Sequence, residues 1–148
     1  LAGLVVTLDS GLIDVREILH RINQRVEALY DRDHCIGHAY FTALAQVPDG
    51  DARLAALEQV FRNRIVPLLE EYFFEDWRKI RLVFGDNQKK DEQTHFIRES
   101  QDHEQDLNSL FGSDHGLGAY GTKRRYTVQE SAFSKPDAYI GIYQTLIS

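Results

Sequence analysis

Two histidines and the chain's only cysteine fall within the stretch DRDHCIGHAYF, residues 31–41. His34 and His38 are four residues apart, so on a helix they would face one side, as the histidines of HExxH zinc enzymes do. The intervening residues form HCIGH, which lacks the glutamate that serves as general base, and no second Cys or His cluster offers further ligands. We therefore expect no metal ligands here. A small metal-dependent enzyme that uses His34 and His38 is the most distant alternative.

A cysteine nucleophile is the second chemistry that this stretch suggests. Cys35 and His34 are adjacent, and adjacent residues on a helix point about 100° apart, which prevents in-line proton transfer. The local sequence also matches no cysteine-protease signature. We expect Cys35 to be a small buried residue and His34 to border a turn, and we predict no catalytic residue in the chain.

A glycine-rich segment, GLGAYG at residues 116–121, formally satisfies the GxGxxG pattern. A dinucleotide-binding turn needs a strand before it and a helix after it, whereas here a polar segment precedes and an extended one follows. We expect a flexible loop, with the basic triplet 123–125 as a solvated strand edge. No GxxxxGK[ST] phosphate loop is present.

Four acidic residues could in principle bind a cation or perform acid–base chemistry: Glu70, Glu71, Glu75 and Asp76. Apolar residues are interleaved with them at helical spacing. We therefore expect these carboxylates to form the solvated side of an amphipathic helix.

The composition sets outer limits. A chain of 148 residues predicts one domain, and its net charge of −6 argues against a protein that coats nucleic acid. No apolar run is long enough to span a membrane, and one cysteine allows no internal disulfide, so we expect a cytoplasmic protein. Because the sequence starts at Leu1 and contains no methionine, we expect a piece of a longer polypeptide.

The elements that position these residues are mainly helices. Apolar residues recur every three or four positions from Asp14 to Tyr30 and again over residues 54–73, where Pro67 predicts a kink or break. Shorter helices are expected at residues 36–46 and before Gly85, which is a typical helix stop. Together they predict a small helical bundle over residues 1–87.

The remaining segment, residues 88–148, has a different character. Residues 89–106 are polar and predict a surface helix or a mobile connector. Residues 124–133 and 138–144 are rich in β-branched and aromatic residues and predict a short β-hairpin around a turn at 135–137. The predicted fold class is thus mostly α, a small helical bundle followed by a C-terminal extension with a short hairpin.

The motif RDHCIGHAYF, followed by RIVPLLEEYFFEDWRKIRLVFGDN, resembles the C-terminal end of the McrB family, the AAA+ GTPase subunits of methylcytosine-dependent restriction systems. The resemblance covers about residues 14–87. The last part of the chain, with AFSKPDAYIGIY, looks like an extension found in some relatives.

The resemblance implies an AAA+ lid, which covers the nucleotide in a ring-type oligomer of like subunits. The Walker A loop, the Walker B acids and the MNxxDR signature would then lie upstream of this sequence. The full-length parent would use GTP or ATP with Mg²⁺, whereas this fragment alone would bind no cofactor. The implied partners are an McrC-like nuclease subunit and, through the full complex, DNA, with no membrane involved.

The resemblance also singles out Gly37, His38 and Tyr40. A helix that starts near His38 would direct free amides and its positive dipole end at an anion. AAA+ lids place a sensor-2 residue, often arginine, at a comparable helix start, and His38 or Tyr40 would be its nearest equivalent. Ala39 replaces a serine that is common in the family. The alternative is that His38 and Tyr40 only pack the core of the lid.

Two functions follow as hypotheses. The first is a lid fragment of a nucleotide-hydrolysing restriction subunit, inactive by itself because it lacks Walker A and Walker B. The second is a protein-interaction module that docks a partner nuclease or a neighbouring subunit without nucleotide.

Overall fold

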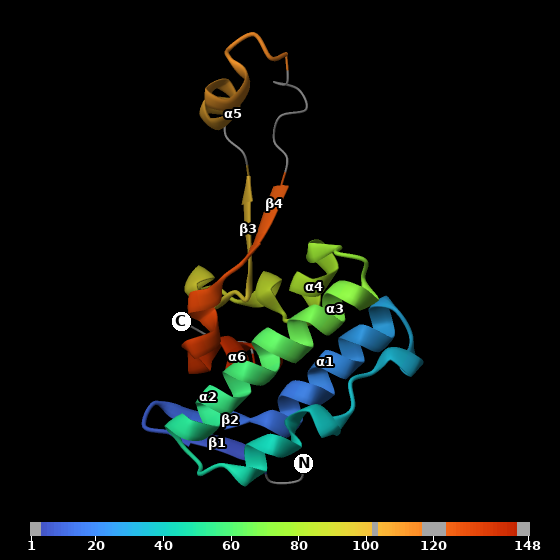
Figure 1. Ribbon diagram of the computed structural model, residues 1–148, viewed down its shortest axis with the longest axis vertical. Helices are drawn as coiled ribbons and strands as arrows, with labels where there is room; N and C mark the ends of the chain where they lie inside the picture. The colour runs from blue at the N-terminus through green and yellow to red at the C-terminus, as the bar shows by residue number, and fades with distance from the viewer. Residues whose placement is uncertain (1–3, 102–103, 117–123, 145–148) are drawn as a thin grey trace.

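The computed structural model describes residues 4–101, 104–116 and 124–144 (Figure 1). Helices form a body, and a two-stranded arm projects from it and carries a short helix at its far end (Figure 1). The mostly α fold class with a short hairpin in the C-terminal extension is confirmed. No helix in these residues is long and apolar enough to cross a membrane.

Sixteen elements are described in chain order. They are β1 (Val5–Leu8), β2 (Gly11–Asp14), α1 (Val15–Leu29), η1 (Arg32–His34), η2 (His38–Gln46), α2 (Asp51–Val60), η3 (Phe61–Ile65), α3 (Val66–Tyr72), α4 (Trp77–Val83), η4 (Asp86–Gln88), η5 (Glu92–Thr94), β3 (Ile97–Gln101), α5 (Glu104–Phe111), β4 (Arg124–Val128), η6 (Glu130–Ser134) and α6 (Pro136–Tyr143).

Helix α1 begins where the sequence predicted. The Asp14 carboxylate accepts hydrogen bonds from the backbone N–H groups of Arg16 and Glu17, at 3.1 and 3.3 Å, as an N-cap does. The Asp14 N–H donates to the hydroxyl of Tyr143 at 3.0 Å, which fastens the end of α6 to the start of α1. The buried face of α1 consists of Val15, Ile18, Leu19, Ile22 and Val26.

The predicted break near Pro67 takes the form of a π-helical turn. Helices α2 and α3 are separated by η3, in which the Val66 N–H bonds to the carbonyl of Phe61, five residues earlier. Pro67 lacks an N–H and its ring crowds the preceding turn, so a widened turn just upstream accommodates it.

Gly85 ends the α4 segment in the left-handed region, with φ of 71°, as predicted for a helix stop. A side chain at this position would also collide with Arg25, whose guanidinium lies 2.8 Å from an added Cβ. That guanidinium donates to the carbonyl of Val83 at 3.0 Å and so ties α1 to α4.

A buried ion pair follows Gly85 at once. Asp86 is fully buried and accepts from the Lys89 ammonium at 2.8 Å and from the N–H groups of Phe96 and Ile97 at 3.1 and 2.8 Å. The ammonium also donates to the carbonyl of Thr94 at 3.0 Å. Burial lowers the pKa of Lys89, while Asp86 opposes that shift. These bonds attach the chain after residue 87 to the helical body.

Aromatic side chains also pack the chain after residue 87 against the helical body. Five aromatic rings lie with their centroids 4.9 to 5.9 Å from those of their neighbours in one cluster, contributed by Phe61, Phe84, Phe96, Phe133 and Tyr139. The hydrophobic core is therefore continuous from residue 4 to residue 142. The division into segments 1–87 and 88–148 stays a prediction, with a shared core between them.

The predicted strand at residues 138–144 is wrong, because this segment is helix α6. Pro136 stands in its first turn, where a missing N–H is tolerated, and Ala138, Tyr139 and Ile142 are buried at helical spacing. The other predicted strand, residues 124–133, is confirmed over β4 only, because its end from Glu130 onward forms η6. The antiparallel partner of β4 is β3, within the segment predicted to be a helix or a connector. The β1–β2 hairpin was not predicted.

The turn between α3 and α4 holds two non-glycine residues in the left-handed region. Phe74 has φ of 52° and Glu75 has φ of 62°. Backbone hydrogen bonds fix them, from the Glu75 N–H to the carbonyl of Glu70 and from the Asp76 N–H to that of Phe73, both at 2.9 Å. Phe74 is 86% exposed, more than any other large apolar residue described.

We predict that Asp86→Asn lowers the free energy of unfolding by about 3–5 kcal/mol, because it leaves the Lys89 charge buried without its partner. The measurement is urea unfolding followed by circular dichroism. Glu71→Gln, at an exposed carboxylate, is the control and should stay within about 0.5 kcal/mol of wild type. Equal stability of the two variants would contradict the role assigned to the pair.

We predict that Phe74→Gly raises the free energy of unfolding by about 1 kcal/mol, because glycine adopts the left-handed conformation without a Cβ clash and little apolar contact is lost. Thermal unfolding measures this. Phe73→Gly is the contrasting variant: Phe73 is 5% exposed, and its loss should destabilise the fold. Destabilisation by Phe74→Gly would show that the exposed ring supports the fold.

Candidate functional site

The segment before His38 is held by one side chain of α1. The Asn23 amide donates to the carbonyl of Ile36 at 2.9 Å and accepts from the N–H of Ile36 at 2.6 Å. Ile36 itself is buried. The two bonds fix both backbone groups of one residue, and this fixes where the next two residues emerge. Asn23 thus positions Gly37 and His38.

Gly37 is the N-cap of η2, with φ of −76° and ψ of 152°. Any residue can adopt this conformation, and an added Cβ would meet no described atom within 4 Å. Neither the backbone nor the surroundings therefore require glycine here. The space that a side chain at position 37 would enter is open.

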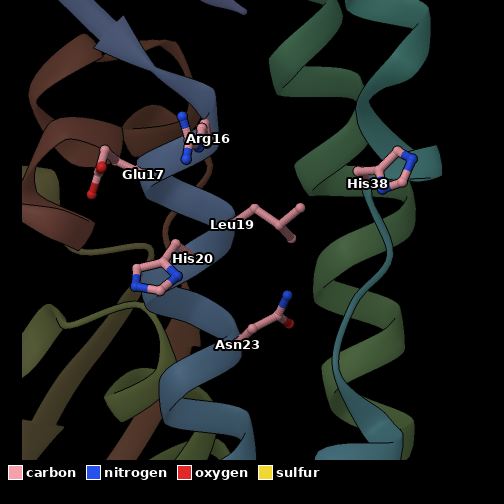
Figure 2. Close-up of a pocket in the computed structure, with 6 residues that line it drawn as sticks. All are labelled: Arg16, Glu17, Leu19, His20, Asn23 and His38. Atoms are coloured by element: carbon pink, nitrogen blue, oxygen red, sulfur yellow. The ribbon is translucent and has the colours of Figure 1, made fainter. Parts of the chain in front are cut away.

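His38 is exposed and lies across from the N-terminal half of α1, where the two segments enclose a pocket of about 400 Å³ (Figure 2). Figure 2 shows Leu19 and Asn23 pointing from α1 toward the segment that carries His38, whereas Glu17 and His20 lie on the other side of the helix. The remaining lining residue is Arg16.

Tyr40 lies elsewhere. It does not line this pocket, and the Arg64 guanidinium lies over its ring, 5.9 Å from the centroid. Tyr40 is half-buried and packs against the hydrophobic core. Of the three predicted residues, His38 therefore lines the pocket and Gly37 directly precedes it, whereas Tyr40 packs against Arg64.

The pocket lining carries one permanent positive charge, one carboxylate and two imidazole rings. Arg16 supplies the positive charge, and His38, at the start of η2, supplies a ring that donates or accepts hydrogen bonds. Glu17 is the opposing carboxylate. Arg16 and Asn23 were not predicted from the sequence. Helical spacing alone would have placed Leu19 and Asn23 on one face of α1, since these two residues are four positions apart.

His34 belongs to an aromatic cluster. Its ring stacks on Tyr30 at 3.9 Å between centroids and meets the edge of Tyr72 at 5.0 Å. Its Nδ1 lies 2.5 Å from a carboxylate oxygen of Asp31, and this hydrogen bond is the main cause that lowers the pKa of Asp31. His34 thus borders a turn, as predicted.

Cys35 is half-buried, and its Sγ contacts the carbonyl of Asn23 at 3.7 Å. Burial raises the pKa of the thiol, so it stays protonated at neutral pH and is a poor nucleophile. Across the described parts of the chain, no three His, Cys, Asp or Glu side chains are arranged to hold a metal ion.

The other motifs are peripheral. Glu71, Glu75 and Asp76 are exposed, and the Asp76 carboxylate accepts from the N–H of Lys79 at 3.3 Å as the cap of α4. Most of the glycine-rich segment 116–121 lies outside the described residues, as does Lys123. Arg124 pairs with Glu99 at 3.1 Å, on the arm.

Residues 14–81 match the family model described as the alpha-helical lid domain of McrB. The matched range runs from the cap of α1 into α4 and includes the pocket and Asn23. Comparisons with curated proteins and with solved structures found no match.

We predict that Asn23→Ala makes the segment before His38 more mobile, because it removes both hydrogen bonds to Ile36. The free energy of unfolding should fall by about 1–3 kcal/mol. Hydrogen exchange of the Ile36 amide measures this and should speed up. Asn23→Asp keeps the acceptor and loses the donor, so its exchange rate should fall between those of wild type and Asn23→Ala. Unchanged exchange in Asn23→Ala would contradict the positioning role.

Proposed function

Residues 14–81 belong to the McrB lid family, and from this premise we propose that the chain is the C-terminal part of an McrB-like AAA+ nucleotide-hydrolysing subunit of a modification-dependent DNA restriction system. In this proposal the helical body is the lid over the nucleotide and takes part in subunit contacts. The family match carries the proposal, and the geometry around His38 supports it.

The nucleotide-facing surface is the pocket between α1 and η2. A Cβ added at Gly37 would meet open space, and His38 is exposed. Arg16 adds a positive charge to the lining of the same pocket as His38. A nucleoside triphosphate is an anion with a flat base, and this surface offers amides and a cation to its phosphates. GTP or ATP, with Mg²⁺, would be bound between this lid and the Walker-bearing part of the parent. Tyr40 acts here by packing the lid under Arg64.

The parent assembly follows from the same resemblance. Like subunits form a ring-type oligomer in the cytoplasm, and an McrC-like nuclease subunit and DNA join through the full complex. The Walker A loop and the Walker B acids belong to the part of the parent that precedes the lid. In this proposal the lid supplies contacts rather than chemistry.

A second function is favoured by a different observation. The exposed Phe74, held on a strained turn, suits a protein-interaction module that docks a partner nuclease or a neighbouring subunit without nucleotide. The two functions are compatible within one parent protein.

We predict that the purified 148-residue chain binds GTP and ATP more weakly than about 1 mM and hydrolyses neither. One half of a nucleotide site provides few contacts, and the proposal assigns the activation of water to the Walker-bearing part of the parent. Titration with fluorescent nucleotide analogues and a phosphate-release assay measure the two quantities. Measurable turnover by the chain would overturn the proposal.

In the intact subunit, we predict that His38→Ala weakens nucleotide binding about fivefold, the effect of one lost hydrogen bond of about 1 kcal/mol. Gln24→Ala is the control, since Gln24 is also an exposed polar residue, lies on α1 and does not line the pocket. An equal effect of the two variants would place the nucleotide elsewhere.

A further inference from the structure

The turn at residues 73–76, between α3 and α4, has features that neither the fold nor the lid pocket explains. Phe74 is 86% exposed, and both Phe74 and Glu75 have positive φ. Residues with a Cβ avoid this conformation, and a glycine or asparagine would adopt it more readily. The strain is thus maintained while the turn presents a large apolar ring to solvent. Strained backbone of this kind concentrates at functional sites.

The base of this turn is firmly packed. Phe73 is 5% exposed and lies 6.1 Å from the ring of Tyr30, which is also 6.2 Å from the ring of Tyr72. Tyr72 in turn meets the edge of His34. The ring of Phe74 therefore projects from a fixed support. A preorganised aromatic side chain loses little conformational freedom on binding, which is a property of interface hot spots.

The charges around Phe74 select the class of partner. Three exposed acidic residues, Glu71, Glu75 and Asp76, lie on the turn or just before it, and two exposed basic residues, Arg78 and Lys79, follow in α4. The acidic residues that flank Phe74 itself disfavour nucleic acid and anionic lipid surfaces as partners. An apolar pocket bordered by Lys or Arg side chains would complement both the ring and the carboxylates.

We propose that residues 73–76 form a docking turn, in which Phe74 inserts into an apolar pocket of a different protein subunit and the surrounding carboxylates pair with basic residues at the rim of that pocket. The inference rests on the proposed function in one respect, because a multi-subunit motor supplies such a partner. The turn lies within the matched lid family segment but is separate from the pocket at His38.

The first test locates the partner. A photo-crosslinking phenylalanine analogue replaces Phe74 in the full-length parent in its host cells, and the crosslinked peptides are sequenced by mass spectrometry. The control places the same analogue at Leu12, which is 49% exposed on β2. We expect position 74, and not position 12, to crosslink to an apolar peptide of another protein that carries Lys or Arg. No specific crosslink, a crosslink to another copy of this chain, or one to nucleic acid would overturn the docking turn.

The second test measures affinity with the identified partner in purified form. Phe74→Gly, which should fold at least as stably as wild type, is expected to weaken binding at least about tenfold. Leu12→Ser should bind like wild type. Glu71→Gln with Glu75→Gln should weaken binding and reduce its dependence on salt. Wild-type affinity of Phe74→Gly would overturn the proposal.

The two proposals fail in different ways. A crosslinked partner that has neither nucleotide-binding nor nuclease motifs would support the docking turn and contradict the restriction-motor role. Nucleotide-dependent activity of the parent that survives Phe74→Gly together with wild-type partner affinity would overturn the docking turn and leave the motor role standing.

Discussion

The buried contact between Asp86 and Lys89 is the constraint on which the arrangement of the chain depends. Two opposite charges with almost no solvent contact are stable only when each is also hydrogen-bonded, and here the carboxylate accepts two backbone N–H groups and the ammonium donates to a carbonyl. Those backbone groups belong to the segment that leads into β3. The pair therefore fixes where the chain leaves the helical body.

The consequences extend to both ends of the chain. With β3 anchored at Phe96 and Ile97, its partner β4 returns to the body and delivers Phe133 and Tyr139 to the aromatic cluster around Phe61. Helix α6 then reaches the start of α1. The helical lid and its extension thus share one core, so a defect at Asp86 would loosen both.

The sequence predicted the elements whose signals are local. The cap of α1, the break before Pro67 and the stop at Gly85 depend on neighbouring residues, and all three were found. The segment 138–144 was assigned wrongly because an apolar aromatic run fits a buried strand or a buried helix equally well. Strand β3 was not predicted because its sequence is polar. Asn23 depends on Ile36, 13 residues away, and Asp86 bonds to the N–H groups of Phe96 and Ile97, 10 and 11 residues away, as well as to the nearby Lys89. His38 was linked to a nucleotide only through the family resemblance, since its place in a pocket depends on how α1 packs.

Helix α1 connects the two proposed surfaces. Its N-terminal half lines the pocket opposite His38, and Tyr30, directly after its C-terminus, packs against Tyr72 and Phe73 beneath the docking turn. A helix of 15 residues spans about 22 Å and transmits displacement along its axis with little internal deformation. If nucleotide contacts one end and a partner subunit the other, movement of the lid over the nucleotide would move the docking turn by a comparable distance. The coupling would then require no conformational change within the lid, because its continuous core makes it move as one body.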